Sequence, residues 1–408
     1  MRVLILSQYY DPEPVPKPAE LARALIERGH SVSVLTGVPN YPKGELYAGY
    51  GLRLFQRSKL DGVPVIRTYE YPYHGKRVAG RLLNYGSMVL SMFLAIPRLS
   101  KADVMYVWHP PLTIGIAAWL VSRFRGIPFV YDVQDIWPES AILAGLLRPG
   151  LMVRLMSRME KFVYARASHI LVVTEGARQN LLAKGVEPSK VSILPHWIDE
   201  SIFESVPESE VMRIREQYGW DDRFIVLFGG NLGLVQGLDS VLRAATQLAG
   251  NLVRVVLVGD GSDRQRLQQL AIDLGVQDRV QFIDRQPMAA MPAFMAAADV
   301  LLVHLKRSDL SHYVIPTKTF AYLAAGRPIL MAMEGAAADL VRAAEAGVVI
   351  VPDDAALLAR TIEDLRAKAP AERSRLGESG RTYLRANFSK QGVIGAYERL
   401  LASVASRP

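Results

Sequence analysis

Basic and hydroxyl side chains gather in one short segment of the C-terminal half. Lys306 and Arg307 precede a helical pattern that opens with Thr317, Lys318 and Thr319. A cation in the first turn of a helix is unfavourable beside the helix dipole unless an anion is bound there too. The segment therefore suggests a clamp for a diphosphate, with an ordinary solvated helix face as the alternative.

Two glycine-rich loops could approach the same anion. Each follows an apolar run and precedes a helical pattern: FGGNLG at 228–233, with Gly229, Gly230 and Asn231, and VGDG at 258–261, with Gly259, Asp260 and Gly261. Glycine lets a backbone approach a phosphate closely, and a helix N-terminus favours an anion. Neither loop has the GxGxxG or P-loop spacing. Tight strand-to-helix turns, with Asp260 as a cap, are the alternative.

A dense polar loop, YDVQDIWPES at 131–140, leaves another apolar run. It carries Asp132, Gln134, Asp135 and Glu139. A second acidic loop, with Asp11 and Glu13, follows the first apolar run. A general base, a ligand for sugar hydroxyls and simple helix capping all remain open for these carboxylates.

Short β-branched runs must position these loops. They alternate with amphipathic stretches, which is typical of parallel sheets covered by helices. The pattern occurs twice, separated by a more polar stretch at about 198–223. We therefore expect an α/β fold of two doubly wound, Rossmann-like domains, 1–200 and 201–385. Ligands of such sheets bind beyond the carboxyl ends of the strands, so we expect a cleft between the two domains.

Composition excludes several kinds of site. The 408 residues include no cysteine and seven scattered histidines, which excludes thiolate metal sites and disulfides and argues against a histidine-based one. The net charge is +8, and residues 1–200 hold 24 Lys and Arg against 16 Asp and Glu, so the whole excess lies there. A basic first half suggests an anionic partner, with ordinary surface solubility as the alternative.

One uncharged segment, 82–97, lies downstream of Lys76, Arg77 and Arg81. It is shorter than the ~20 residues of a membrane-spanning helix. A helix lying on an anionic membrane surface and an amphipathic core helix are both open. The N-terminus lacks the features of a secretory signal.

These motifs together resemble the retaining glycosyltransferases of the GT-B fold, in the GT4-like family. The similarity is greatest to the fucosamine-transferase-like subgroup that builds O-antigen, capsule and colanic-acid units. The resemblance rests on six motifs in order: SQYYDPEP with the following AELARALIERGHSVSVLTGVPNYP, DVQDIWPES, ILPHWIDESIF, FGGNLGLVQGLD, LVGDG and IPTKTFAYLAAGRPIL.

The resemblance implies transfer of a sugar from a nucleotide sugar, UDP being favoured over GDP, with no metal and no cofactor. The C-terminal domain would hold the donor through Gly229, Gly230, Asn231, Gln236, Gly259, Asp260, Gly261, Arg285, Lys306, Arg307, Thr317, Lys318 and Thr319. The reaction centre would include Asp132, Gln134, Asp135, Glu139 and His109, although a structural histidine before Pro110 is equally open. Asp11, Glu13, Lys76, Arg77 and Arg81 would face a polyprenyl-diphosphate-linked acceptor.

The same resemblance implies a cytoplasmic enzyme, peripheral to the inner face of the cell membrane, of hexosyl or N-acetylhexosaminyl type. The C-terminal helix, 386–408, would pack back on the first domain. Tyr313 and Ala321 stand where many members of the family have a pair of glutamates, the second of which holds the donor. A binding protein for nucleotide sugars or lipid phosphates, and a nucleotide-sugar 2-epimerase, therefore stay as alternatives. We expect no nucleic-acid partner.

Overall fold

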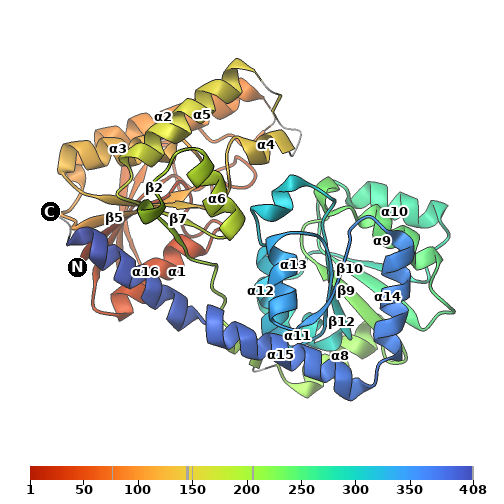
Figure 1. Cartoon of the computed structure of the whole chain (residues 1–408). Helices are drawn as coiled ribbons and strands as arrows, with labels where there is room; N and C mark the ends of the chain where they lie inside the picture. The colour runs from red at the N-terminus through yellow and green to blue at the C-terminus, as the bar shows by residue number, and fades with distance from the viewer. Residues whose placement is uncertain (76, 144–146, 149, 205, 407–408) are drawn as a thin grey trace. The chain divides into compact units, whose positions relative to one another are not determined.

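In the computed structural model the chain divides into two compact units (Figure 1). One unit comprises Met1–Leu194 with Ile394–Pro408, and the other Pro195–Val393. The structure describes residues 1–406 except 76, 144–146, 149 and 205.

The first unit is built on an eight-stranded sheet in the order β3-β4-β2-β1-β5-β6-β7-β8. All neighbouring pairs are parallel except β3 and β4. Buried β-branched and aromatic side chains fill the central strands. The strands are β1 (Arg2–Leu6), β2 (Ser31–Gly37), β3 (Phe55–Leu60), β4 (Val63–Thr68), β5 (Val104–His109), β6 (Phe129–Val133), β7 (His169–Val172) and β8 (Val191–Ile193).

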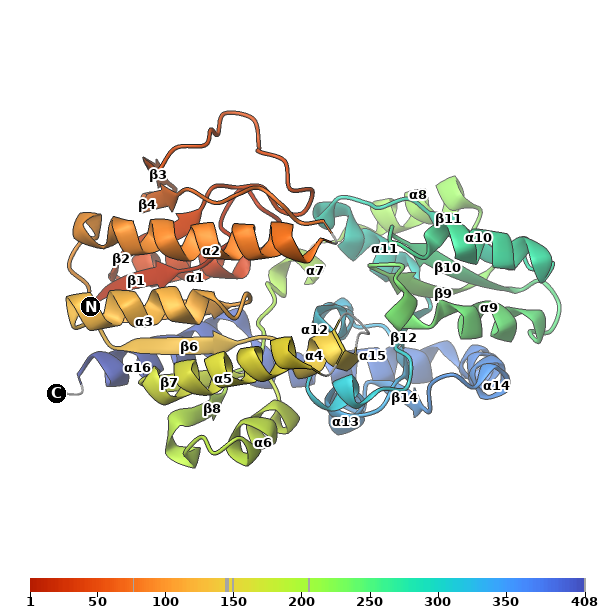
Figure 2. The ribbon, with the colours of Figure 1, turned by 90° about the horizontal axis from the view of Figure 1, so that it is seen from above.

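Helices cover this sheet. Figure 2 shows α2, α3 and α5 running side by side, and Figure 1 shows α1 on the opposite face. The helices of this part are α1 (Lys17–Glu27), α2 (Val78–Ala95), α3 (Ile114–Arg125), α4 (Glu139–Leu143), α5 (Leu151–Arg166) and α6 (Glu175–Ala183).

The second unit has a six-stranded, wholly parallel sheet in the order β11-β10-β9-β12-β13-β14. Successive residues of β9 point to opposite faces. Ile225 and Leu227 join one core with α8, α11, α12 and α13, and Val226 and Phe228 join another with α9, α10 and α14. The strands are β9 (Phe224–Gly229), β10 (Val253–Val258), β11 (Val280–Ile283), β12 (Val300–His304), β13 (Ile329–Ala332) and β14 (Gly347–Ile350).

The helices of the second unit are α7 (Ser201–Glu204), α8 (Glu208–Tyr218), α9 (Leu238–Thr246), α10 (Arg264–Asp273), α11 (Met291–Ala297), α12 (Thr317–Ala325), α13 (Ala336–Ala343), α14 (Ala355–Ala367) and α15 (Pro370–Phe388). The prediction of two doubly wound α/β domains is confirmed.

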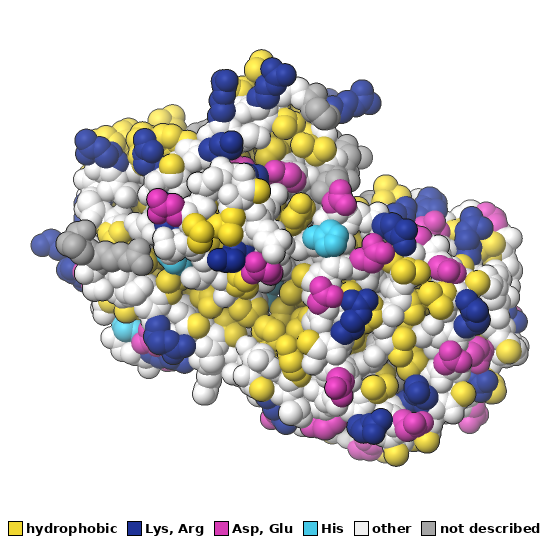
Figure 3. Space-filling view, in the orientation of Figure 1, with side chains coloured by type: hydrophobic (Ala, Val, Ile, Leu, Met, Phe, Trp, Pro, Cys, Tyr) yellow, Lys and Arg dark blue, Asp and Glu magenta, His cyan; other side chains and the backbone are white. Residues whose placement is uncertain are grey.

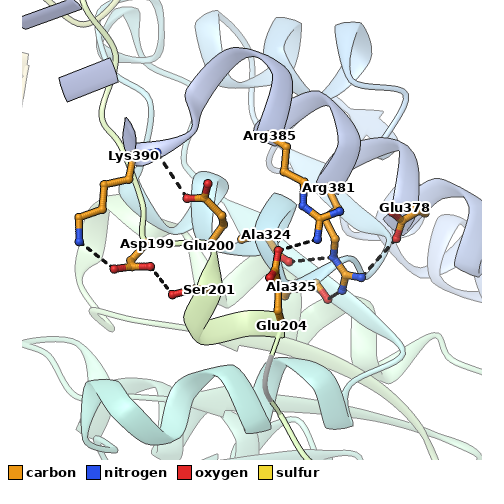
Figure 4. A network of polar contacts seen from close by, with 10 residues as sticks. All are labelled: Asp199, Glu200, Ser201, Glu204, Ala324, Ala325, Glu378, Arg381, Arg385 and Lys390. Atoms are coloured by element: carbon orange, nitrogen blue, oxygen red, sulfur yellow. Dashed lines mark hydrogen bonds and ion pairs between the residues drawn. The ribbon is translucent and has the colours of Figure 1, made fainter. Parts of the chain in front are cut away.

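Helix α15 is fastened to α12 and α7 by charged side chains (Figure 4). Arg381 donates to the carbonyls of Ala324 and Ala325, at 3.2 and 3.0 Å, and so caps the C-terminal end of α12. Arg385 pairs with Glu204 of α7 at 2.6 Å. The Arg381 contacts hold α12, the helix whose first turn carries Lys318.

The last helix, α16 (Lys390–Ala405), ends in the first unit. Its Glu398 pairs with Arg28 at 2.8 Å and with His30 at 2.7 Å, at the end of α1. Buried Tyr397 and Leu401 pack into the same unit. The first unit is therefore built from residues near both ends of the chain.

Helix α2 begins four residues earlier than the uncharged segment and continues to Arg98 as a 3-10 turn. The 21 residues from Val78 to Arg98 are long and apolar enough to cross a membrane by length and composition alone. The helix is therefore longer than the uncharged segment alone indicated. One face of the helix, with Asn84, Met88 and Met92, is nevertheless buried in the first unit.

Candidate functional site

The two glycine-rich loops of the second unit pack backbone against backbone. The amide of Gly230 donates to the carbonyl of Val258 at 2.9 Å, and the amide of Leu232 donates to that of Asp260 at 2.9 Å. A Cβ on Gly259 would lie 1.9 Å from the carbonyl oxygen of Gly230, so a larger side chain has no room there. The glycines are required for this close approach.

Lys318 lies directly beside the first loop, in the first turn of α12. Its Nζ is 3.6 Å from the centroid of the Phe228 ring, and a Cβ on Gly230 would lie 3.1 Å from it. The nitrogen is buried and has no hydrogen-bond partner among the described residues. Burial lowers the pKa of Lys318 to about 7.

Two more α12 residues complete this edge of the sheet. The hydroxyl of Tyr322 accepts the amide hydrogen of Gly229 at 2.8 Å, which fixes the end of β9 against the helix. The hydroxyl of Thr319 is buried and has no partner within the described residues. The geometry thus gathers two glycine loops, a helix N-terminus, an amine and a hydroxyl, a set that suits a phosphate.

Other predicted donor residues lie around this core with varied exposure. The backbone carbonyl of Gln236 is bonded to His304 Nδ1 at 2.7 Å, and the side chain of Lys306 packs against Gly237. Asp260 accepts the amide of Gly261 at 2.8 Å, as a turn cap does. Arg285 and Thr317 are exposed.

Arg307 is directed toward carboxylates of its own unit. Its guanidinium lies 3.4 Å from Glu334, and its amide donates to Asp353 at 2.9 Å. Ala321 is half-buried against the core of the second unit, at the position where the resemblance expects a glutamate. No carboxylate is therefore provided by α12 itself.

Asp132, predicted for the reaction centre, is a buried structural hub of the first unit. It has no exposed surface and accepts hydrogen bonds from Tyr106, Tyr397 and Gln134. Lys17 lies 3.9 Å away. With its oxygens engaged inside the protein, Asp132 is suited to position Gln134 rather than to contact a substrate.

Five buried polar atoms without a partner in the described structure lie near the ends of β5 and β6. They belong to His109, Thr113, Gln134, Trp137 and Ser140. Burial lowers the pKa of His109 to about 3, so its ring is neutral at physiological pH. Buried polar atoms usually have a hydrogen-bond partner, so this edge of the sheet is suited to bind a polar ligand.

The two remaining carboxylates of the loop differ in their surroundings. Burial raises the pKa of Asp135. Glu139 begins α4 and pairs with Lys184 at 2.9 Å, and Lys184 also pairs with the buried Glu160 at 2.7 Å. Glu139 therefore fastens α4 to α6 and α5.

The acidic loop after β1 is held by its own chain. Glu13 is buried and accepts the backbone amides of Tyr10, Asn40 and Tyr41 at 3.1, 2.9 and 2.9 Å. Burial raises the pKa of Glu13 to about 7, against the effect of those amides. Asp11 pairs with Arg23 at 2.8 Å. Both carboxylates thus stabilise the loop after β1. They had been predicted to face the acceptor.

The predicted basic residues stand at the start of α2. Arg77 is exposed at its N-terminal cap, and exposed Arg81 donates to the carbonyl of Gly75 at 3.0 Å. Lys76 lies outside the described residues.

Sequence reasoning missed a buried cluster at the ends of β1, β2 and β4. Gln8, Asn40 and Asn84 each donate an amide hydrogen to Oε1 of Glu70, at 2.6, 3.2 and 2.7 Å. Burial raises the pKa of Glu70 to about 8. The one signal in the sequence is Asn84, an amide in the middle of an apolar helix.

Comparisons with known proteins cover most of the chain. Residues 16–197 match the glycosyl transferase 4-like domain, and residues 211–383 match the glycosyl transferases group 1 family. WcaI of Escherichia coli K12, assigned to colanic acid biosynthesis as a glycosyl transferase, is 28% identical over 335 residues, 80% of this chain and 82% of its own length. WbjE of Pseudomonas aeruginosa, named a glycosyltransferase, is 26% identical over 79% of this chain and 80% of its own length.

The solved structure of Anabaena Alr3699/HepE in complex with UDP has the same fold. It matches with a TM-score of 0.74 at 17% sequence identity and covers 99% of this chain and 100% of its own. Both domain matches follow the order of the two doubly wound sheets and confirm the resemblance seen in the motifs. The chain therefore belongs to the glycosyltransferases of the GT-B fold, in the GT4-like family.

Proposed function

We propose that this glycosyltransferase is a retaining enzyme that uses a nucleotide sugar, UDP-linked rather than GDP-linked, without a metal. It moves a hexosyl or N-acetylhexosaminyl group to a polyprenyl-diphosphate-linked acceptor in bacterial surface polysaccharide assembly. The names of WcaI and, at the level of fold, of the UDP-bound Anabaena protein support this assignment. The single observation that carries it is the buried amine of Lys318 beside the Gly230 loop.

The chemistry at this edge follows from the leaving group. The bond between the anomeric carbon and the diphosphate breaks, and a bond to the acceptor oxygen forms on the same face. The acceptor proton passes to the departing diphosphate. Lys318, the loop amides and the N-terminus of α12 stabilise the charge that develops there. Asp132 holds Gln134, and Gln134 with neutral His109 orients the acceptor.

The N-terminal unit offers a surface for an anionic membrane. Val78, Leu83 and Leu90 of α2 are exposed, as are Phe124 of α3 and Leu151 of α5. Glu160, which is buried and paired with Lys184, is the one acidic residue within α2, α3 and α5. Figure 3 shows Lys and Arg beside hydrophobic side chains along the upper edge of this unit. Apolar contact with positive charge favours an anionic bilayer, so we place the enzyme at the inner face of the cell membrane.

A transfer assay tests the proposal. The full-length protein is incubated with labelled UDP-glucose, UDP-galactose, UDP-N-acetylglucosamine or GDP-mannose and a lipid-linked acceptor fraction, and label in the lipid phase is counted. Thermal shift against the same donors reports binding separately. We expect transfer from one UDP-sugar. The anomeric configuration of the sugar in the product shows whether it is retained, as proposed, or inverted.

Lys318→Met should lower transfer at least tenfold, because it removes the charge on the diphosphate. Lys101→Met, which removes a lysine from an exposed position in the first unit, is the matched control. Binding without transfer or donor hydrolysis would favour a binding protein, a role consistent with Ala321. Interconversion of sugar epimers without an acceptor would favour the epimerase.

A further inference from the structure

Lys318 has a buried amine that forms no ion pair or hydrogen bond within the described part of the chain. Its Nζ contacts the Phe228 ring and lies beside Gly230, with no hydrogen-bond partner among the described residues. The contrast is Lys17, which is also buried but has Asp132 at 3.9 Å. A buried ammonium without an opposite charge is strongly unfavourable, and an uncharged amine is the stable form of such a group.

Several titratable groups surround this edge of the sheet. Tyr322 on α12 accepts a hydrogen bond from Gly229, and His304 and Lys306 lie beside Gly237. Asp260 stands on the second glycine loop, and Asp309 and His312 lie in the turn before α12. None of them forms a hydrogen bond with Nζ of Lys318, and burial lowers the pKa of the amine. The described residues therefore supply no hydrogen-bonded charge that would hold a proton on this amine.

We propose that Lys318 is uncharged in the empty enzyme under mildly alkaline conditions and takes up a proton when the diphosphate of the donor binds beside it. This inference rests on the proposed function and adds to it that donor binding and proton uptake are one coupled event. The proton comes from solvent, and the diphosphate supplies the negative charge that the protein lacks. When the nucleotide diphosphate leaves after transfer, the amine returns its proton to solvent.

Coupling of this kind makes donor affinity depend on pH in one direction. Below about pH 7 the free amine already carries its proton, so the dissociation constant is flat. Above pH 7 each binding event must first bring a proton to the site. The dissociation constant should then rise by up to about tenfold for each pH unit.

Isothermal titration calorimetry tests the coupling directly. UDP-glucose, UDP-N-acetylglucosamine and GDP-mannose are titrated into the full-length protein at pH 8 in two buffers of different ionisation heat. Nucleotide sugars are preferred to nucleotides because their diphosphate, esterified at both ends, has no proton to exchange in this range. We expect uptake of close to one proton per bound donor, and a dissociation constant that rises between pH 7 and pH 9.

Two substitutions test whether Lys318 is the group that takes up the proton. Lys318→Arg keeps a charge at every pH, so it should bind donor without proton uptake and with little dependence on pH. Lys318→Met should bind more weakly, also without uptake. Lys101→Met should behave as the unsubstituted protein, and the melting curve of each variant reports that it is folded.

The outcomes separate the two proposals. Donor binding without proton uptake overturns the coupling and leaves the proposed function standing. Proton uptake that persists in both Lys318→Arg and Lys318→Met assigns the proton to another group. That result also overturns the coupling at Lys318. If no nucleotide sugar binds at any pH, both proposals fail together.

Discussion

The hydroxyl of Tyr397 lies 3.1 Å from Oδ2 of Asp132, although the two residues are 265 positions apart in the chain. The same oxygen accepts a hydrogen bond from Tyr106, and the other oxygen accepts one from Gln134. The carboxylate thus joins β5, β6 and α16 in the interior of the first unit. A buried charge that is satisfied in this way organises the loop that follows β6.

Tyr397→Phe removes one of these donors and leaves the ring in place. The free energy of unfolding should fall by about 1 kcal/mol, because a hydrogen bond to a buried carboxylate is lost. Urea unfolding followed by fluorescence measures the change. Tyr71→Phe, at an exposed position, is the control and should change stability little. An equal change in the free energy of unfolding of both variants would argue against a stabilising hydrogen bond between Tyr397 and Asp132.

Gly259→Ala tests the contact between the two glycine loops. The residue has a φ of +147°, and an added Cβ would lie 1.9 Å from the backbone oxygen of Gly230. Backbone on both sides cannot yield without opening the loops, so we expect a fall in melting temperature and loss of donor binding. Gly250→Ala, at φ +61° with nothing within 4 Å, should cost only about 1 kcal/mol for its backbone conformation.

Glu70→Gln should change how stability depends on pH. Burial raises the pKa of Glu70 to about 8 from an ordinary value of 4.5, so between these limits the folded chain binds the proton that the unfolded chain has lost. Stability is therefore fully present below pH 4.5 and falls as pH rises toward 8, by at most about 1.4 kcal/mol per unit. The amide cannot ionise, and the variant should lose this slope.

Unfolding by urea at pH 5.5 and pH 8.5 measures the slope for Glu70→Gln. Glu27→Gln, at the exposed end of α1, is the matched control and should keep it. An unchanged slope in Glu70→Gln would place the pH dependence elsewhere.

Lys318→Met should stabilise the protein at neutral pH while it weakens the site. The folded pKa of about 7 lies below the ordinary 10.5, so between these values the unfolded chain binds a proton that the folded chain does not. Stability then rises with pH through this window, opposite in sign to the effect of Glu70. Methionine removes the penalty, and its melting temperature at pH 7 should exceed that of the unsubstituted protein. A lower melting temperature would contradict the burial of an uncompensated amine.

Leu83→Glu tests the membrane surface of α2. The full-length protein should float with vesicles that contain phosphatidylglycerol, more weakly at high salt because the basic residues are screened. Leu83→Glu should reduce flotation severalfold, because it places a carboxylate where apolar contact is needed. Met212→Glu, an equally exposed apolar position in the second unit, should float normally.

Local features of the fold could be predicted from the sequence. The strands β10 (Val253–Val258) and β11 (Val280–Ile283) are apolar runs in the sequence, as buried parallel strands usually are. The antiparallel edge strand β3 gives no such signal, because its sequence, FQRSKL, is polar and the strand is only partly buried. His109, which precedes Pro110 in the sequence, is the last residue of β5.

Long-range features of the site were not visible in the sequence. The glycine loops were found because each is a short contiguous segment. Gln8, Asn40 and Asn84 meet Glu70 only once three strands and a helix are assembled. Asp132 looked like a reactive carboxylate because its partner Tyr397 comes from the far end of the chain.

The path of α16 has a consequence for biosynthesis. Asp132 leaves the ribosome in the first third of the chain, whereas Tyr397 leaves it among the last residues. Until then the second unit is being translated, and the nascent first unit lacks α16. The apolar surface on which α16 packs stays uncovered, and Asp132 lacks one of its hydrogen-bond donors. A polypeptide that stops before Ile394 would keep that apolar surface exposed to proteases and chaperones. The first unit can therefore be completed only when translation reaches the final helix.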